Sequence, residues 1–263
     1  LIARAPQLGP VLELESEPLT KLLEVCAYRE MVIRARINDA ARAVMLATAT
    51  GADLDNLAAL LGVERLMLAA GDAQARPPIP PVYESDDDMR LRAQLALEGF
   101  SVAGPRGAYE YHARSASADV ADVAVDSPEP GKVRVTVMAR TGDGAADATL
   151  LDEVRAALND ERVRPLCDTV SVRSASVTSY TIQAALSIAP GPDAGVVLER
   201  ARAAAAAYAE NTRRIGTAVT ISGLHAALHG PGVQRVALTR PTAEVDPGPG
   251  GVAHCTNITV VAA

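Results

Sequence analysis

The strongest constraint on the fold of this chain is the spacing of apolar residues between Leu19 and Ala47. Along this stretch they recur at alternating intervals of four and three, interrupted by Glu30. Such spacing is the a/d pattern with which a coiled-coil helix buries one seam against a neighbouring helix. The sequence therefore predicts one long helix with a seam made of Leu19, Leu23, Cys26, Ile33, Ile37, Ala40 and Val44.

The residues at either end of this stretch predict where the helix starts and stops. Ser16 is a suitable N-cap, and Pro18 fits the first turn, where its missing N–H costs nothing. Gly51 can adopt the left-handed conformation that closes a helix. A second, short helix is then expected to run to about Leu61.

Two interpretations of the seam remain open on pattern alone. An amphipathic helix often packs its apolar stripe on its own domain. This helix, however, is longer than a compact domain in a chain of 263 residues needs, which favours burial of the seam against another chain. The second interpretation makes assembly, rather than catalysis, the first functional hypothesis.

Composition narrows the functional classes further. The net charge is −7, tryptophan is absent and only one phenylalanine is present. A nucleic-acid-binding protein needs a basic stripe and usually aromatic platforms, so no nucleic-acid partner is expected. We also expect no bound cofactor. Three widely spaced cysteines imply no disulfide framework and folding in a reducing compartment. No run of 18 apolar residues occurs, so we expect no membrane span.

Clusters of proline and glycine divide the chain into four regions. Residues 1–76 are helical, 77–105 form a proline-rich linker and a short helix, and 106–177 and 178–263 form two small α+β domains. The fold class is therefore α+β, with an N-terminal long-helix bundle region. Extended prolines are stiff, so the linker should act as a spacer with hinge positions at Pro77, Pro78, Pro80, Pro81, Gly99, Gly104 and Gly107.

Alternation and helical periodicity predict the order β-β-α-β in the middle domain. Its elements are a hairpin of 120–125 and 132–138, a helix over 147–158 and a strand over 169–177. The last domain should contain strands at 180–188, 219–221, 233–239 and 257–261, and helices at 194–213 and 223–228, the second capped by Ser222. A loop rich in proline and glycine, from Arg240 to Gly251, separates the last two strands.

A few residue sets could carry chemistry, but each has a simpler interpretation. His225 and His229 share one helix face at zinc-binding spacing, yet residue 226 is Ala where a metalloprotease needs Glu, and no third ligand is near in sequence. A metal-dependent hydrolase using this pair is the alternative function. Gly142 and Gly144 fit a turn better than a phosphate loop. Cys167 is expected in the core, and Asp86–Asp88 in the first turn of a helix.

Several blocks, taken in their order and spacing, resemble the baseplate J-like family of contractile phage tails and related injection machines. They include SEPLTKLLEVCAYREMVIRARINDAARAVMLATATGADLDNLAALL from residue 16 and DDDMRLRAQLALEGFSVAGPRGAYEY from residue 86. RTGDGAAD, VRPLCDTVSV and SGLHAALHGPGVQRVAL follow. The resemblance extends over most of residues 14–240. Family members usually carry residues before the segment that begins here at Leu1, so part of the N-terminal region is expected to be absent.

The resemblance implies a structural, non-enzymatic role. Two J-like chains and one tail protein I-type partner would wrap helices into a bundle, forming a baseplate wedge. Wedges would join into a ring around the hub, touch the sheath and rearrange on contraction. The implied location is the tail baseplate of a virion or equivalent particle, assembled in the bacterial cytoplasm. Residues 178–263, with the long loop and the His225–His229 helix, are predicted to make the ring contacts.

Overall fold

The computed structural model describes residues 3, 5–14, 16–101, 104–161, 163–165, 167–191 and 193–263. The chain divides into two compact units, Leu1–Glu64 and Arg65–Ala263, here called the first and second units. In the described ranges, no helix combines the length and apolar character needed to cross a membrane. The architecture is α+β, with a long N-terminal helix followed by small α+β parts, which confirms the predicted fold class.

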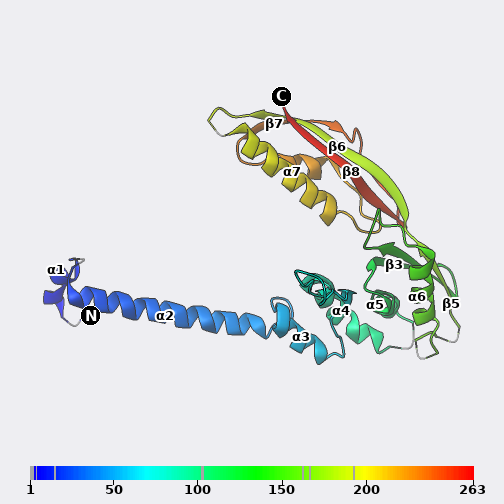
Figure 1. The fold of residues 1–263 in the computed structure, drawn as a ribbon, viewed down its shortest axis with the longest axis horizontal. Helices are drawn as coiled ribbons and strands as arrows, with labels where there is room; N and C mark the ends of the chain where they lie inside the picture. The colour runs from blue at the N-terminus through cyan, green and yellow to red at the C-terminus, as the bar shows by residue number, and fades with distance from the viewer. Residues whose placement is uncertain are drawn as a thin grey trace. The chain divides into compact units, whose positions relative to one another are not determined.

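The first unit is built around one long helix (Figure 1). Its elements are η1 (Pro6–Leu8), α1 (Gly9–Leu12), α2 (Pro18–Ala43) and α3 (Gly51–Ala59). Pro18 lies in the first turn of α2, as predicted, but the N-cap is Glu17 rather than Ser16.

The predicted end of α2 at Gly51 is wrong. The helix ends at Ala43, because residues 44–49 form turns in which the Thr48 hydroxyl donates to the Arg42 carbonyl at 2.8 Å. The Arg42 carbonyl also accepts the Met45 N–H at 3.2 Å, so local bonds close the last turn of the helix. Gly51 instead begins α3, with φ +53°. Val44, the last member of the predicted seam, therefore lies just beyond the helix.

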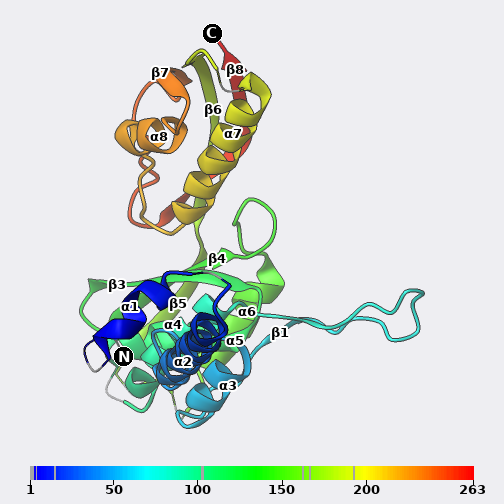
Figure 2. The same cartoon turned by 90° about the vertical axis from the view of Figure 1, so that its left-hand side faces the viewer.

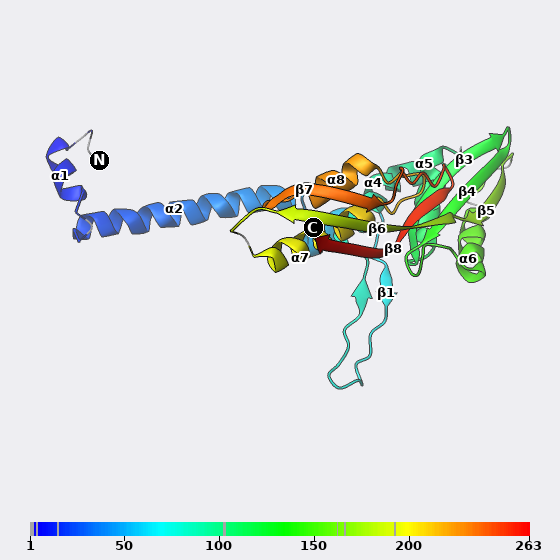
Figure 3. The same cartoon turned by 90° about the horizontal axis from the view of Figure 1, so that it is seen from above.

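The second unit begins with a projecting hairpin, here called the arm (residues 67–83; Figures 2 and 3). Strands β1 (Met67–Ala69) and β2 (Val82–Tyr83) pair antiparallel, and an isolated bridge joins Asp72 to Ile79. Of the prolines expected to form a connector, Pro77 and Pro78 lie in the tip, between the bridged residues Asp72 and Ile79, and Pro80 and Pro81 lie in the returning limb. All four therefore belong to a hairpin whose two limbs start and end side by side.

Helices α4 (Asp86–Gly99) and α5 (Arg106–Ala116) follow and pack together. Ser85 caps α4 by accepting a hydrogen bond from the Asp88 N–H, so the three aspartates occupy the first turn, as expected. A Cβ at Gly99 would lie 2.3 Å from the Tyr111 ring, and one at Gly107 would lie 2.8 Å from the Glu98 side chain. Close packing thus accounts for both glycines, while their role as hinges stays a prediction.

The middle sheet has the predicted β-β-α-β order. Strands β3 (Val120–Glu129) and β4 (Lys132–Ala139) form an antiparallel hairpin, and β5 (Thr169–Ser174) runs parallel to β4 after α6 (Ala148–Leu158). Valines on β3 and β4 form a core with residues of α5 and α6. Gly142 and Gly144 have positive φ in the turn after β4, which supports the turn interpretation. Cys167 is exposed, so its expected place in the core is wrong.

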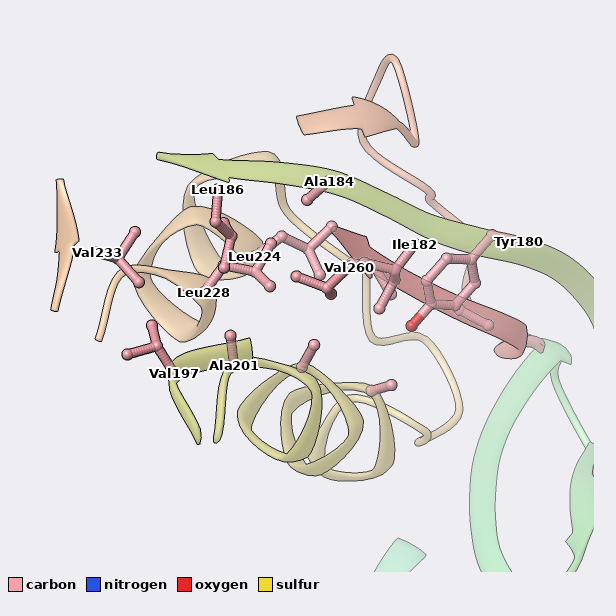
Figure 4. Close-up of a cluster of buried hydrophobic side chains, with 14 residues drawn as sticks. Tyr180, Ile182, Ala184, Leu186, Val197, Ala201, Leu224, Leu228, Val233 and Val260 are labelled. Carbon is pink, nitrogen blue, oxygen red and sulfur yellow. The ribbon is translucent and has the colours of Figure 1, made fainter. Parts of the chain in front are cut away.

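The last part is a three-stranded sheet with order β7-β6-β8. Its strands are β6 (Ser176–Ile188), β7 (Val233–Arg240) and β8 (Gly251–Ala262). Helices α7 (Ala194–Asn211) and α8 (Ile221–Leu228) contribute to one apolar core with residues of these strands (Figure 4). The predicted boundary between residues 177 and 178 falls inside β6.

Three details of this last part differ from the sequence-based expectations. The predicted strand at 219–221 is wrong, because Val219 makes only an isolated bridge to Val245 and Ile221 starts α8. The cap of α8 is Thr220, whose hydroxyl accepts from the Gly223 N–H, rather than Ser222. Strand β8 begins at Gly251, since its parallel pairing with β6 starts there. The loop between β7 and β8 therefore covers residues 241–250.

Candidate assembly surface

Helix α2 is the most unusual surface of the chain, because none of its 26 residues is buried. Of the predicted seam, Leu19 is half-buried and the other six members are exposed. The exposed fractions of Ile33, Ile37 and Val44 are 56%, 61% and 72%. A run of large apolar side chains left in water usually marks a surface that another molecule covers.

The polar residues of α2 explain little of its stability. Lys21 pairs with Glu24 at 3.1 Å, and Arg34 pairs with Glu30 at 2.5 Å, but all four side chains are more than half exposed. Exposed pairs of this kind contribute only about 0.3–0.5 kcal/mol each. Most helical stability in proteins comes from packing of an apolar face. A helix of this length without a packed face is therefore expected to need a partner.

A second apolar row on α2 was missed by the sequence interpretation. Val25, Tyr28 and Val32 follow a spacing of three and four, offset by two residues from the predicted seam, and their exposed fractions are 56%, 63% and 41%. At about 100° per residue, this offset places them on the opposite side of the helix. The signal was present in the sequence as a second copy of the same spacing. Helix α2 thus offers apolar residues to neighbours on two sides.

The arm of the second unit is exposed along its length but firmly held at its base. Met67, Ile79 and Val82 have exposed fractions of 50%, 55% and 49%. At the base, the Arg65 guanidinium donates to the Glu84 carbonyl at 2.8 Å and to the Asp86 carboxylate at 2.7 Å. Arg92 forms an ion pair with Glu84 in which both side chains are nearly fully buried.

The loop of residues 241–250 lies beside a cavity of about 430 Å³. Backbone hydrogen bonds of 2.9 and 3.0 Å between Val219 and Val245 hold the middle of the loop against the segment that precedes α8. The cavity lining is rich in hydroxyl groups and consists of Ser179, Tyr180, Thr181, Arg240, Pro241, Thr242, Ala243, Val245 and Thr256. This is the segment predicted to make ring contacts.

The histidine pair does not form a metal site in the part of the chain that the structure describes. His225 lies in the last turn of α8 and His229 is its C-cap residue. Across the described ranges, no group of three or more His, Cys, Asp or Glu side chains is placed to hold a metal ion. The hydrolase alternative would need three protein ligands, and the described residues supply no such set.

Burial is the main cause of three of the shifted pKa values. Burial raises the pKa of Tyr109, whose hydroxyl also donates to Asp168 at 2.7 Å, and burial raises the pKa of Tyr180. Burial likewise lowers the pKa of His112. Tyr109 and Tyr180 belong to two different apolar cores, so these shifts do not define one site.

Comparison with known proteins identifies the family of this chain. Three domains of one family match in order: the baseplate J-like N-terminal domain at residues 15–72, the central domain at 101–174 and the C-terminal domain at 180–261. Baseplate protein J of Escherichia phage P2 is 48% identical over 250 residues, which covers 95% of this chain and 83% of that protein.

A solved structure gives a weaker likeness. A chain in the cryo-EM structure of the anti-feeding prophage baseplate is 18% identical, with a TM-score of 0.47 over 68% of this chain. This chain spans 44% of that one, and the likeness at this TM-score adds nothing to the assignment. The family match rests on the three domains and on the phage P2 relative. On that basis, the chain belongs to the baseplate J-like protein family.

Proposed function

We propose that this chain is a structural component of a baseplate wedge, with α2 as the element that joins it to other wedge chains. The partners would be a second copy of this chain and a tail protein I-type protein, with hub and sheath proteins around the completed ring. The single observation that carries the proposal is the complete absence of buried residues in α2. The particle would be a phage tail or a related contractile injection machine.

Energetics favour a bundle of several helices over a pair. Fully burying one Leu, Ile or Val side chain contributes about 1.5–3 kcal/mol. The predicted seam and the row of Val25, Tyr28 and Val32 lie on opposite sides of α2, so one neighbour could cover only one of them. Two neighbouring helices would bury both, which fits a bundle of two J-like chains and one partner helix.

A single charge in the seam tests the bundle. Ile37→Asp places a carboxylate where the proposal needs an apolar contact, and it should abolish co-purification with the wedge partner. Asn38→Asp is the matched control, because it adds the same residue one position away from the seam and should assemble normally. Both variants should keep the unfolding temperature of the second unit. If Ile37→Asp co-purifies as well as Asn38→Asp, α2 is not the joining element.

We further propose that residues 178–263 join neighbouring wedges into the ring. The loop of residues 241–250 motivates this assignment, because it is longer than the most common connections of about four to six residues. Deleting Pro241–Gly250 should give wedges that form but do not join, as seen by electron microscopy of the assembled particles. The contact should persist in the presence of a chelator. Normal rings from the deletion variant would contradict the assignment.

We also propose a hinge that lets the two copies in one wedge adopt different conformations. Two copies in one wedge would occupy different surroundings, so we expect a hinge at residues 99–107 to differ in conformation between copies. Residues 77–81 lie within the arm, so a change there would alter only the direction of the arm. A structure of the assembled wedge tests this when the two copies are superposed part by part. Identical conformations of the whole chain in both copies would exclude a hinge there.

A further inference from the structure

An arginine-rich pocket lies on the face of the middle sheet opposite its apolar core. The pocket has a volume of about 250 Å³ and is lined by three arginines and one aspartate. Arg134 and Asp126 lie opposite each other on β4 and β3, and Arg173 comes from β5. Arg106 comes from the start of α5. Pro249 and Gly250, at the end of the loop, also line it, together with Ala124, Val125 and Thr136.

The positive charges of the pocket exceed the negative charge that faces them. Arg134 makes a two-pronged ion pair with Asp126, and this contact lowers the pKa of Asp126, assisted by the charges of Arg173 and Arg106. The Nε of Arg173 donates to the Thr136 hydroxyl at 3.0 Å, while its Nη2 lies against Gly250, where a Cβ would be 2.2 Å away. Three guanidinium groups thus face one carboxylate in the pocket lining, in a protein of net charge −7.

Two acidic residues on the loop of residues 241–250 carry negative charge that no arginine in the described ranges pairs with. Glu244 and Asp246 flank Val245, which the two backbone bonds to Val219 hold in place, and both acidic side chains are exposed. Side chains alternate along extended backbone, so both acids project away from the side on which Val245 packs. Asp246 accepts only the Gly248 N–H at 2.8 Å, and in the described ranges neither acid forms an ion pair with an arginine.

We propose that the acidic residues of this loop, Glu244 and Asp246, enter the arginine pocket of a neighbouring copy of the same chain. The pairing would be the chemistry of the ring contact, so this inference rests on the proposed role of residues 178–263. Guanidinium groups bind carboxylates in a planar, bidentate geometry, which supplies orientation as well as attraction. Such a contact also holds without a large apolar interface, which suits a ring that must rearrange.

A second copy fits this pocket because the donor and the acceptor lie on one patch. The acids and the pocket wall are separated by three to six residues of the loop, at most about 20 Å of extended chain. A patch that carries both partners is self-complementary, and a two-fold contact would satisfy both copies at once. Nucleic acid is a poor alternative occupant, since the pocket is small and the chain as a whole is acidic.

Charge exchange tests the pairing in the assembled particle. Arg106→Glu and Glu244→Arg should each lower the number of rings at least about tenfold, because each variant places like charges together. The double variant restores opposite charges across the contact and should recover rings to within about threefold of the parent. Rings would be counted by negative-stain electron microscopy after production of the full chain with the other tail proteins.

Controls separate a lost contact from a lost fold. Arg155→Glu changes the same kind of charge on α6, outside the pocket, and should leave ring number unchanged. Arg106 is exposed at the start of α5, so its variant should keep the parent unfolding temperature. If that temperature falls, Arg173→Glu, on strand β5, replaces it in the double variant with Glu244→Arg.

The outcomes distinguish this inference from the proposal beneath it. Rescue by the double variant supports the pairing. Parental ring numbers in both single variants, or a double variant as poor as the singles, overturn it. If deletion of Pro241–Gly250 abolishes rings while the charge variants assemble normally, the ring contact stands and the pairing falls. If that deletion leaves rings intact, the assignment of the ring contact itself fails.

Discussion

Helices α2 and α7 start from similar sequence signals and end in opposite environments. Both are long and begin with a defined cap region, and both carry small or apolar residues at helical spacing. Helix α7 buries Val197, Ala201, Ala205 and Ala209, a row spaced by four, against its own sheet. Helix α2 buries nothing. Periodicity therefore predicts that a helix has a face to cover, but it does not say which chain covers it.

Side-chain size separates the two helices. The buried row of α7 is mostly alanine, which lets the helix lie close to the strands of its own domain. The exposed surface of α2 carries Leu, Ile, Val, Met and Tyr, which present far more apolar area than alanine does. Residues of this size in water make the free chain prone to association. The difference is the basis for the proposal that α2 contacts other helices.

The largest expected effect comes from placing one charge in each helix. Ala205→Asp buries an unpaired carboxylate at a fully buried position, which should cost the second unit about 4 kcal/mol or more. Ala40→Asp adds the same group to an exposed position of α2 and should change unfolding by less than about 1 kcal/mol. Urea unfolding followed by circular dichroism measures both.

The two variants should prevent assembly for different reasons. Ala40→Asp should leave the free chain folded yet block bundle formation, whereas Ala205→Asp should fail by unfolding. A large loss of stability from Ala40→Asp in the free chain would mean that α2 packs on its own chain after all. Helices α2 and α7 would then both pack within their own chain.

The sequence was sufficient to predict local structure but not which distant segments pair with each other. The hairpin of β3 and β4 and the helices α6 and α7 were predictable, because alternation and helical spacing report local geometry. The arm was not, since Pro77–Pro81 favour extended backbone whether they connect two domains or belong to a hairpin. Only the pairing of Asp72 with Ile79 decides between the two, and that is a non-local fact.

The candidate site was only partly predictable for the same reason. The seam of α2 followed from spacing, but the pocket of Arg106, Arg134 and Arg173 combines residues from a helix and two strands that no motif connects. The early end of α2 also escaped prediction. It depends on the Thr48 hydroxyl capping Arg42, and Gly51 was the more obvious signal.

A second prediction compares ion pairs in the two units. Glu84→Ala removes the partner of Arg92 inside the second unit, where both side chains are more than 90% buried. A buried guanidinium that loses its carboxylate partner should cost about 3–5 kcal/mol, although Arg92 also donates to the Ser115 hydroxyl at 3.4 Å. Glu30→Ala removes the partner of Arg34 on α2, where both side chains are exposed, and should cost about 0.5 kcal/mol or less. Chemical denaturation of the free chain measures both, and equal losses would show that α2 is not solvated there.

The smallest effect is expected from pH and should also belong to the second unit, since α2 contains no histidine. Burial lowers the pKa of His112 below its ordinary value of 6.5, with a hydrogen bond to the Gly99 backbone in partial opposition. The unfolded chain then binds a proton more readily than the folded chain, so stability is complete above about pH 6.5 and falls as the pH drops below it. His112→Gln removes this titrating group and should reduce the loss of stability between about pH 7 and 5. Denaturation of the parent and the variant at both pH values measures the difference, and equal losses would assign the acid sensitivity to other groups.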